Sequence, residues 1–315
     1  MNDVCKSIAD VVANVHEIIA NERECCPEEK DAEFFFRGES RSHYDGDDFG
    51  TSFQSSLDRL NLVQYERDIF NDAMRLNVAD FDLDRTMPER IARMQHYQLP
   101  TRFADISENV LTALFFAVSK GYGSESERSK DEDGYIRVIK IAKFKMKQYN
   151  SDIIIAISHL PLVKNEQIKF HEGEDGIDYL RYEITNSRPG FGVAATPDIK
   201  RQLIDELQQV WAFRPLCNSR RLRNQAGAFL VFGCGDGKTS LNPSFAPSDY
   251  EENCPSRGIK QIAYIRIAAD AKEAIREELR LYGISEETVY PELANVNAAI
   301  SNRYRDKLRS KENEI

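Results

Sequence analysis

One stretch of the chain, residues 93–117, constrains the fold more than any other. Polar residues crowd around Pro100, and an almost uninterrupted apolar run from Val110 to Ala117 follows them. The run predicts a buried helix, because a helix that is apolar on all sides has to lie inside the protein. Side chains of His, Arg, Asp and Ser precede it in close succession, and such density is unusual beside buried elements. We therefore expect these polar residues to border the core and to carry function.

Hydrophobic spacing along the rest of the chain separates helices from strands. Helices are predicted at residues 3–21, 53–77, 88–96, 108–120, 197–214 and 269–282, and a last one from Pro291 onward. Runs rich in aromatic and β-branched residues predict strands at 33–37, 101–105, 135–141, 228–233 and 261–268. Helices and strands mix without regular βαβ alternation, which indicates an α+β fold with a central, mostly antiparallel sheet.

The chain contains no convincing linker, so we expect one main domain. In this interpretation residues 1–30 form an N-terminal helical segment and residues 31–315 form the domain. Two segments near 121–134 and 185–197 are rich in charged or small residues, and we expect them to be surface insertions.

The net charge of −10 restricts the partners of the chain. Nucleic-acid backbones repel an acidic protein, so weak binding to duplex DNA is expected. No apolar run approaches the roughly 20 residues of a membrane span, and the N-terminus lacks the pattern of a secretory signal. The six cysteines include no Cys-x-x-Cys pair, and no histidine pair stands at metal spacing. This predicts reduced thiols in the cytoplasm and no structural metal site.

The first candidate site residues end a strand of three phenylalanines. Arg37 follows Phe36 there, and its guanidinium offers a planar fork for a phosphate or a carboxylate. Gly38 would let a ligand or a neighbouring backbone approach closely. The alternative is that Arg37 only pairs with a buried acid such as Asp105.

A second candidate group flanks Pro100, which stiffens the turn between its members. His96 and Tyr97 precede the proline, and Thr101 and Arg102 follow it. A histidine at such a position could contact a ribose or donate a proton near neutral pH. Alternatively, it is a structural residue held by hydrogen bonds.

Asp105 and Ser107 stand where the predicted strand meets the apolar helix. The start of a helix favours anionic ligands, so both residues are candidates for a binding site. In the alternative interpretation, Ser107 is an ordinary N-cap of that helix, and Asp105 orients Arg102 or Arg37.

A third candidate group lies just before the strand predicted at 228–233. Arg220, Arg221 and Arg223 form a cationic cluster in an acidic protein, and Gln225 follows them. A solvated turn is the alternative interpretation of this cluster.

The Phe-Arg-Gly tripeptide at residues 36–38 and the block beginning at His96 resemble the FRG domain, a bacterial family named for that tripeptide. The family's block reads His-Tyr-Gly-Leu-Pro-Thr-Arg-Leu-Leu-Asp-Trp-Thr, whereas this chain has His-Tyr-Gln-Leu-Pro-Thr-Arg-Phe-Ala-Asp-Ile-Ser. A later Arg-x-x-x-Gln-x-Gly-x-Phe element and a distal Gly-Ile element extend the resemblance from about residue 33 to about residue 300. Gln98 replaces a glycine of the family, which predicts strain if that position needs a positive φ.

A remoter resemblance is to the ADP-ribosyltransferase fold. That fold has an arginine after its first strand, a hydroxyl residue before a helix, and a glutamate or glutamine before a later strand. Arg37, Ser107 and Gln225 occur in that order here. The resemblance implies that Arg37 binds NAD, that Ser107 orders the site, and that Gln225 contacts the ribose and supports an oxocarbenium-like transition state. The usual glutamate is missing, and Glu287 or Glu292 would replace it only if the fold brought either one close.

Three functions are open from the sequence. The chain is an NAD-consuming, ADP-ribosyltransferase-like toxin or phage-defence effector, with Arg37, Ser107 and Gln225 as catalytic residues. Or it is a module that binds a nucleotide or a nucleic-acid end without turnover. Or its motifs form only an internal polar network. For the first two we expect a nucleotide-sized phosphate ligand, with NAD as first choice. Its binding residues would be Gly38, His96, Tyr97, Thr101, Arg102, Asp105, Arg221 and Arg223. We expect the separated groups to converge on one cleft, since ligand sites form where strand ends meet.

Overall fold

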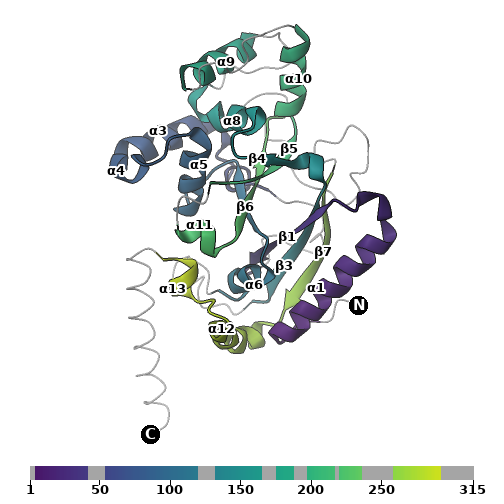
Figure 1. Cartoon of the computed structure of the whole chain (residues 1–315). Coiled ribbons are helices and arrows are strands. Elements are labelled where there is room, and N and C mark those ends of the chain that lie inside the picture. Colours follow the sequence, from purple (N-terminus) through teal and green to yellow (C-terminus); the bar gives the residue numbers. More distant parts are fainter. Residues whose placement is uncertain are drawn as a thin grey trace.

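The computed structural model describes residues 4–41, 54–119, 132–164, 175–187, 197–216, 220–235 and 258–291. Within them a curled sheet of seven strands has the order β4-β5-β6-β2-β1-β3-β7 (Figure 1). The strands are β1 (Glu33–Glu39), β2 (Phe103–Ser107), β3 (Gly134–Ile141), β4 (Met146–Gln148), β5 (Val210–Arg214), β6 (Gly227–Phe232) and β7 (Ile259–Ile267). Neighbouring strands pair antiparallel except β4 and β5, which are parallel. The predicted α+β class and mostly antiparallel sheet are confirmed.

Helices of the described chain pack mainly at the two ends of this sheet (Figure 1). At the end near β4 and β5 lie α3 (Glu66–Leu76), α5 (Met87–His96), α8 (Asp152–His159), α9 (Asp175–Ser187) and α10 (Pro197–Leu207). Near β1, β3 and β7 lie α1 (Ile8–Cys25), α6 (Val110–Val118) and α12 (Lys272–Leu281). The short helices are α2 (Ser56–Arg59), α4 (Val78–Phe81), α11 (Arg220–Asn224) and α13 (Glu286–Val289).

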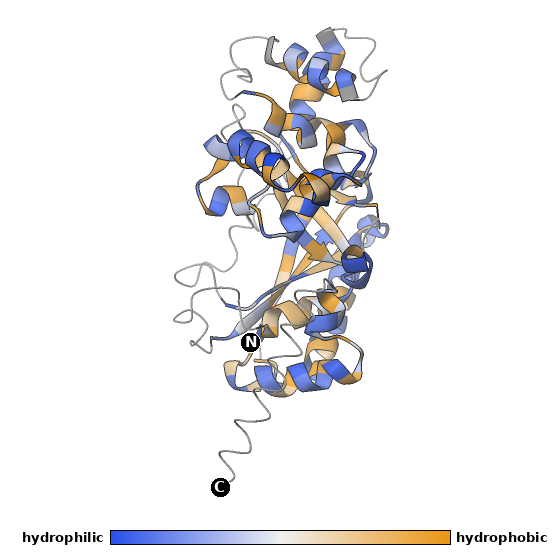
Figure 2. Cartoon of the chain, turned by 90° about the vertical axis from the view of Figure 1, so that its left-hand side faces the viewer, coloured by the Kyte–Doolittle hydropathy of each residue, from blue (hydrophilic) through white to orange (hydrophobic). Residues whose placement is uncertain are grey.

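Strand alternation divides the apolar side chains between the two faces of the sheet. On β2, Ala104 and Ile106 join Phe35 of β1 in a core enclosed by the curl of the sheet. Phe103 enters a core on the other face, with α3, α5, α8 and α9. Phe36 enters a separate core with α1, α6 and α12. In Figure 2 the strands and the helices against them carry much of the apolar, orange colour. The helical face thus has two apolar cores, and β1 and β2 meet between them.

Two glycines let α6 approach the sheet closely. A Cβ on Gly38 of β1 would lie 1.7 Å from the carbonyl oxygen of Ala113, and one on Gly134 of β3 would lie 2.2 Å from that of Ala117. Both clashes involve helix backbone, which cannot turn aside as a side chain can. Of the two sequence interpretations of Gly38, approach of a neighbouring backbone is therefore the one that the structure shows.

The elements predicted around residues 93–117 and in the sheet are present, with differences elsewhere. The helix predicted at 53–77 is broken into α2 and α3, and the one predicted at 197–214 ends at Leu207 and gives way to β5. Residues 210–213 are aromatic and apolar, and pairing with β6 makes them part of a strand. The described part of the chain also contains α8 and α9, which we did not predict. Residues 185–187 end α9, whereas 120–131, 188–196 and the final predicted helix beyond Pro291 lie outside the described residues.

Candidate functional site

A cavity of about 510 Å³ lies between the two helical cores, where β1 and β2 meet. Phe36, Ala113 and Tyr290 border it from one core, and Leu222 and Phe229 border it from the other. Among the described residues its polar lining comes from four separate segments and consists of Arg37, Ser56, Arg59, Gln95, His96, Gln98, Asp105, Ser107, Arg221 and Gln225. The structure thus brings Arg37, the polar block after α5 and Gln225 to one cavity.

Arg37 borders the cavity from β1, and its guanidinium is held in place. Its Nε donates to Oε1 of Glu39 at 3.3 Å, and its Nη1 donates to the backbone oxygen of Asp105 at 2.8 Å. Glu39 is buried and also accepts from Nε of Arg137 at 3.1 Å. Arg37 therefore does pair with a buried acid, but the acid is Glu39, and Asp105 contributes its carbonyl group. These bonds tie β1 to β2 at the edge of the cavity.

Asp105 of β2 is the one carboxylate residue among the described residues that line this cavity. Its Oδ2 accepts from Nε2 of Gln95 at 2.8 Å, and Oε1 of Gln95 accepts from the Thr101 hydroxyl at 2.7 Å. Thr101 is buried, and its amide donates to the Ser56 hydroxyl at 3.0 Å. Thr101, one of the predicted ligand-binding residues, does not line the cavity, and its hydroxyl orients Gln95 and through it Asp105.

Ser107 and Gln225 connect β2 to the segment before β6. The Ser107 hydroxyl donates to the backbone oxygen of Gln225 at 2.7 Å and accepts from the amide of Asn109 at 3.0 Å. Nε2 of Gln225 donates to the backbone oxygen of Val289 at 3.2 Å. The N-cap of α6 is Asn109, whose side chain accepts from the amide of Leu111, so Ser107 is not the N-cap. Because its hydroxyl already makes two hydrogen bonds, Ser107 holds the site together.

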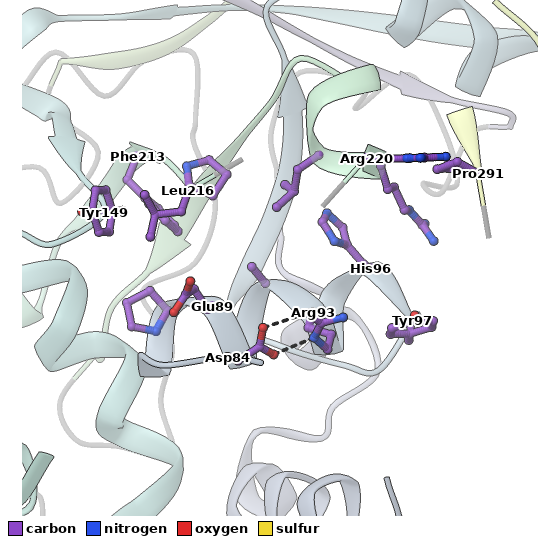
Figure 3. Close-up of a pocket in the computed structure, with 15 residues that line it drawn as sticks. Asp84, Glu89, Arg93, His96, Tyr97, Tyr149, Phe213, Leu216, Arg220 and Pro291 are labelled. Atoms are coloured by element: carbon purple, nitrogen blue, oxygen red, sulfur yellow. Dashed lines mark hydrogen bonds and ion pairs between the residues drawn. The ribbon is translucent and has the colours of Figure 1, made fainter. Parts of the chain in front are cut away.

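His96 and Arg221 stand between this cavity and a second one. The second cavity measures about 200 Å³, lies between α5 and the end of β5, and is drawn in Figure 3. His96 is buried, with its ring 5.9 Å from that of Phe229, and the Arg221 guanidinium lies 4.7 Å from the centre of the Tyr290 ring. Both residues line both cavities, whereas Tyr97 is half-exposed and lines only the smaller one.

Arg102 and Arg223 are two more predicted ligand-binding residues that do not line the main cavity. Arg102 is 2% exposed, and its Nε and Nη2 bind the two carboxylate oxygens of Glu66 at 2.5 and 2.8 Å. Burial lowers the pKa of Arg102, but the buried Glu66 carboxylate outweighs that effect and raises it overall. The charge of Arg102 is therefore neutralised by Glu66 in an internal ion pair. Arg223 is exposed, because α11 turns it away from the face shared by Arg221 and Gln225.

Two residues with positive φ lie at or beside the main cavity. Gln98 lines it and has a φ of 65°, and Ala226, which stands between the lining residues Gln225 and Gly227, has a φ of 43°. The strain predicted at Gln98 is confirmed. Residues other than glycine rarely adopt this region, and those that do are often found at functional sites.

Positive charge dominates the lining of the main cavity. Arg37, Arg59 and Arg221 border it together with Asp105, which supplies the one carboxylate of the described lining, in a protein whose net charge is −10. The sequence analysis missed Arg59, Gln95 and Tyr290 as lining residues. Gln95 belongs to the polar block around Pro100 and could have been found there, whereas nothing local marks Arg59.

Comparison with known proteins identifies one family. Residues 32–126 match the model of the FRG domain, which covers β1, the block from His96 to Ser107, and α6. The match is shorter than the span of about residues 33–300 over which we noted the resemblance. No curated protein and no solved structure matches the chain. Nothing in these comparisons supports the resemblance to ADP-ribosyltransferases, binding of NAD, or a role as a toxin or in phage defence. In the described part of the chain, every helix is too short or too polar to span a membrane.

Proposed function

We propose that this FRG domain-containing protein binds a nucleotide-sized phosphate ligand in the main cavity, without turnover. The observation that carries the proposal is the convergence of Arg37, Arg59, Arg221 and His96 on one cavity of an acidic protein. Its volume of about 510 Å³ falls within the range of roughly 300–1,000 Å³ that is typical of small-molecule sites.

Aromatic residues beside the charges suit the ring of a base. Tyr290 and Phe116 line the cavity with their rings 6.1 Å apart, and Arg221 lies over Tyr290. Stacking on an aromatic ring fixes the orientation of the planar guanidinium, which favours two-pronged hydrogen bonding to a phosphate. A nucleotide offers both a ring and a phosphate, so it matches this lining better than inorganic phosphate does.

The charge distribution also selects the size of the ligand. A cationic cavity inside a protein of net charge −10 attracts small anions, whereas the remaining surface repels a long polyanion. We therefore expect duplex DNA to bind weakly at physiological salt.

Two arginines of one helix provide the test. Arg221 lines the cavity, whereas Arg223, two residues further along α11, is exposed and does not. Nucleotide binding should raise the melting temperature of the protein and give a measurable dissociation constant in calorimetry. Arg221→Ala should weaken binding about tenfold or more, because a charged hydrogen-bond donor is lost, and Arg223→Ala should leave it unchanged. No response to nucleotides, combined with tight and salt-sensitive binding to duplex DNA, would refute the proposal.

A second candidate function, cleavage of NAD with transfer of ADP-ribose, is favoured by Asp105. Its carboxylate lines the same cavity as Gln225 and is held by Gln95. In this proposal it takes the place of the missing glutamate and stabilises the positive charge that develops on the ribose. Release of nicotinamide from NAD, lost in Asp105→Asn, supports this activity. If NAD binds but no nicotinamide is released by the wild-type protein, the binding function alone stands.

A further inference from the structure

The two cavities of the site share a wall. His96, Arg221 and Leu222 line both of them, so the smaller cavity adjoins the larger one through these side chains. In Figure 3, Tyr149, Phe213 and Leu216 lie on one side of the smaller cavity, and His96 and Arg220 lie toward the other. His96 and Arg221 are the polar residues among the described ones that line both cavities. Both carry nitrogen donors that can bind an anion.

The smaller cavity is built to take a ring, but it is too small to be a site on its own. Its volume of about 200 Å³ lies below the roughly 300 Å³ at which small-molecule sites begin. Pro215, Leu216, Tyr149 and Phe213 give it apolar and aromatic walls. Such walls favour a flat, partly apolar group that enters while the rest of the ligand is held next door.

The opposite side of the smaller cavity is rigid. Arg93 of α5 binds both carboxylate oxygens of Asp84, at 2.6 and 2.8 Å, and this pair lies on its floor (Figure 3). Glu89 is engaged as well, because it accepts hydrogen bonds from the amides of Arg85 and Thr86. These charges are satisfied within the protein, so the anion-binding groups are Arg220 and the two residues of the shared wall, His96 and Arg221.

We infer that the two cavities bind the two ring-bearing halves of one dinucleotide, with His96 and Arg221 at the phosphate bridge between them. This inference rests on the proposed function and narrows it, because it names the class of nucleotide. The base of one half lies against Tyr290 in the main cavity, and the ring of the other half enters between Tyr149 and Leu216.

Calorimetry with three probes tests the inference. ADP has one ring-bearing half, whereas NAD and diadenosine diphosphate each have two. We expect at least one dinucleotide to bind about tenfold or more tightly than ADP, because a second ring is buried. Leu216→Trp, at a half-buried position, fills the smaller cavity and should remove this advantage while the affinity for ADP stays the same. Leu83→Trp, at an exposed position outside both cavities, is the matched control.

The outcomes separate this inference from the proposed function. If ADP binds and neither dinucleotide binds more tightly, the inference is wrong and the proposed function stands. If Leu216→Trp weakens ADP and the dinucleotides equally, the second ring does not lie in the smaller cavity, and the inference is again wrong. If no nucleotide binds, both fail. Tyr149→Ala, which removes one wall, gives the same comparison should Leu216→Trp not fold, and it too should reduce only the affinity for the dinucleotide.

Discussion

Substitution of Gly38 by alanine separates the two roles that a glycine can have at the edge of a cavity. The new Cβ would lie 1.7 Å from the Ala113 oxygen, 2.7 Å from the Ala113 carbonyl carbon and 2.8 Å from the amide nitrogen of Ala117. All three atoms belong to the backbone of α6, whose buried face packs into the core with Phe36. The helix would have to retreat by more than an ångström, because ordinary contacts of a Cβ begin near 3.4 Å.

Overpacking of a core usually costs about 1–3 kcal/mol, and displacement of a whole helix belongs at the upper end. We therefore expect Gly38→Ala to lower the free energy of unfolding by about 3 kcal/mol. That is a large part of the roughly 5–15 kcal/mol that stabilises a typical domain. Urea unfolding can be followed by the fluorescence of Trp211, the single tryptophan, which is buried in β5.

Gly227→Ala is the matched control, because a Cβ there has no neighbour closer than 3.8 Å. It should change the free energy of unfolding by less than about 1 kcal/mol. A stable Gly38→Ala protein that no longer binds nucleotides would refute this reasoning. It would mean that the glycine leaves room for a ligand and not for α6.

Three further predictions concern backbone strain, the buried ion pair and pH. Gln98→Gly should raise the free energy of unfolding by up to about 1 kcal/mol, because a φ of 65° suits glycine. Gln98→Val should lower it by about 1–2 kcal/mol, because a β-branched residue does not tolerate that φ. Equal urea midpoints for the two variants would contradict the strain. Glu66→Ala should lower the free energy of unfolding by about 3–5 kcal/mol in the same assay, because it leaves the Arg102 guanidinium buried without its carboxylate. A loss below about 1 kcal/mol would show that water reaches Arg102 easily. Burial lowers the pKa of His159 from its ordinary value of 6.5, so the unfolded state takes up a proton there before the folded state does, and stability should fall as pH drops below about 6.5. Urea unfolding at pH 8 and pH 5.5 should show a smaller loss for His159→Gln than for the wild type, and identical losses would exclude His159 as a cause.

The short-range patterns of the sequence were sufficient where one element determines the geometry. The apolar run at residues 110–117 is helical, and the Phe-Arg-Gly strand is present, because periodicity and side-chain type act within a single element. The sequence indicated strain at Gln98 if the family's glycine there has a positive φ, and the φ of 65° meets that condition. The prediction that residues 210–214 belong to a helix was wrong, because pairing with β6, which no local pattern reveals, makes them a strand.

In the candidate site, too, the sequence indicated which segments come together but not which side chains bond to one another. The expectation that Arg37, Asp105 and Gln225 lie together agrees with the structure, because Arg37 and Asp105 lie in the paired strands β1 and β2 and Gln225 just precedes β6, which pairs with β2. The partner of each residue did not follow from the sequence. Arg102 pairs with Glu66, 36 residues away, so it is removed from the site, although its neighbours in the sequence are in it.

The sequence by itself therefore determined the class of the fold, the presence of an FRG domain and most of the segments that border the cavity. These depend on residue types and on the order of motifs along the chain. The tertiary structure alone decided which charges face the cavity and which are neutralised inside the protein. It also showed that the glycine of Phe-Arg-Gly makes room for α6, and that a second cavity adjoins the first. The physical reason is that burial and ion pairing are made between elements far apart in the chain, and no local pattern records the distance between them.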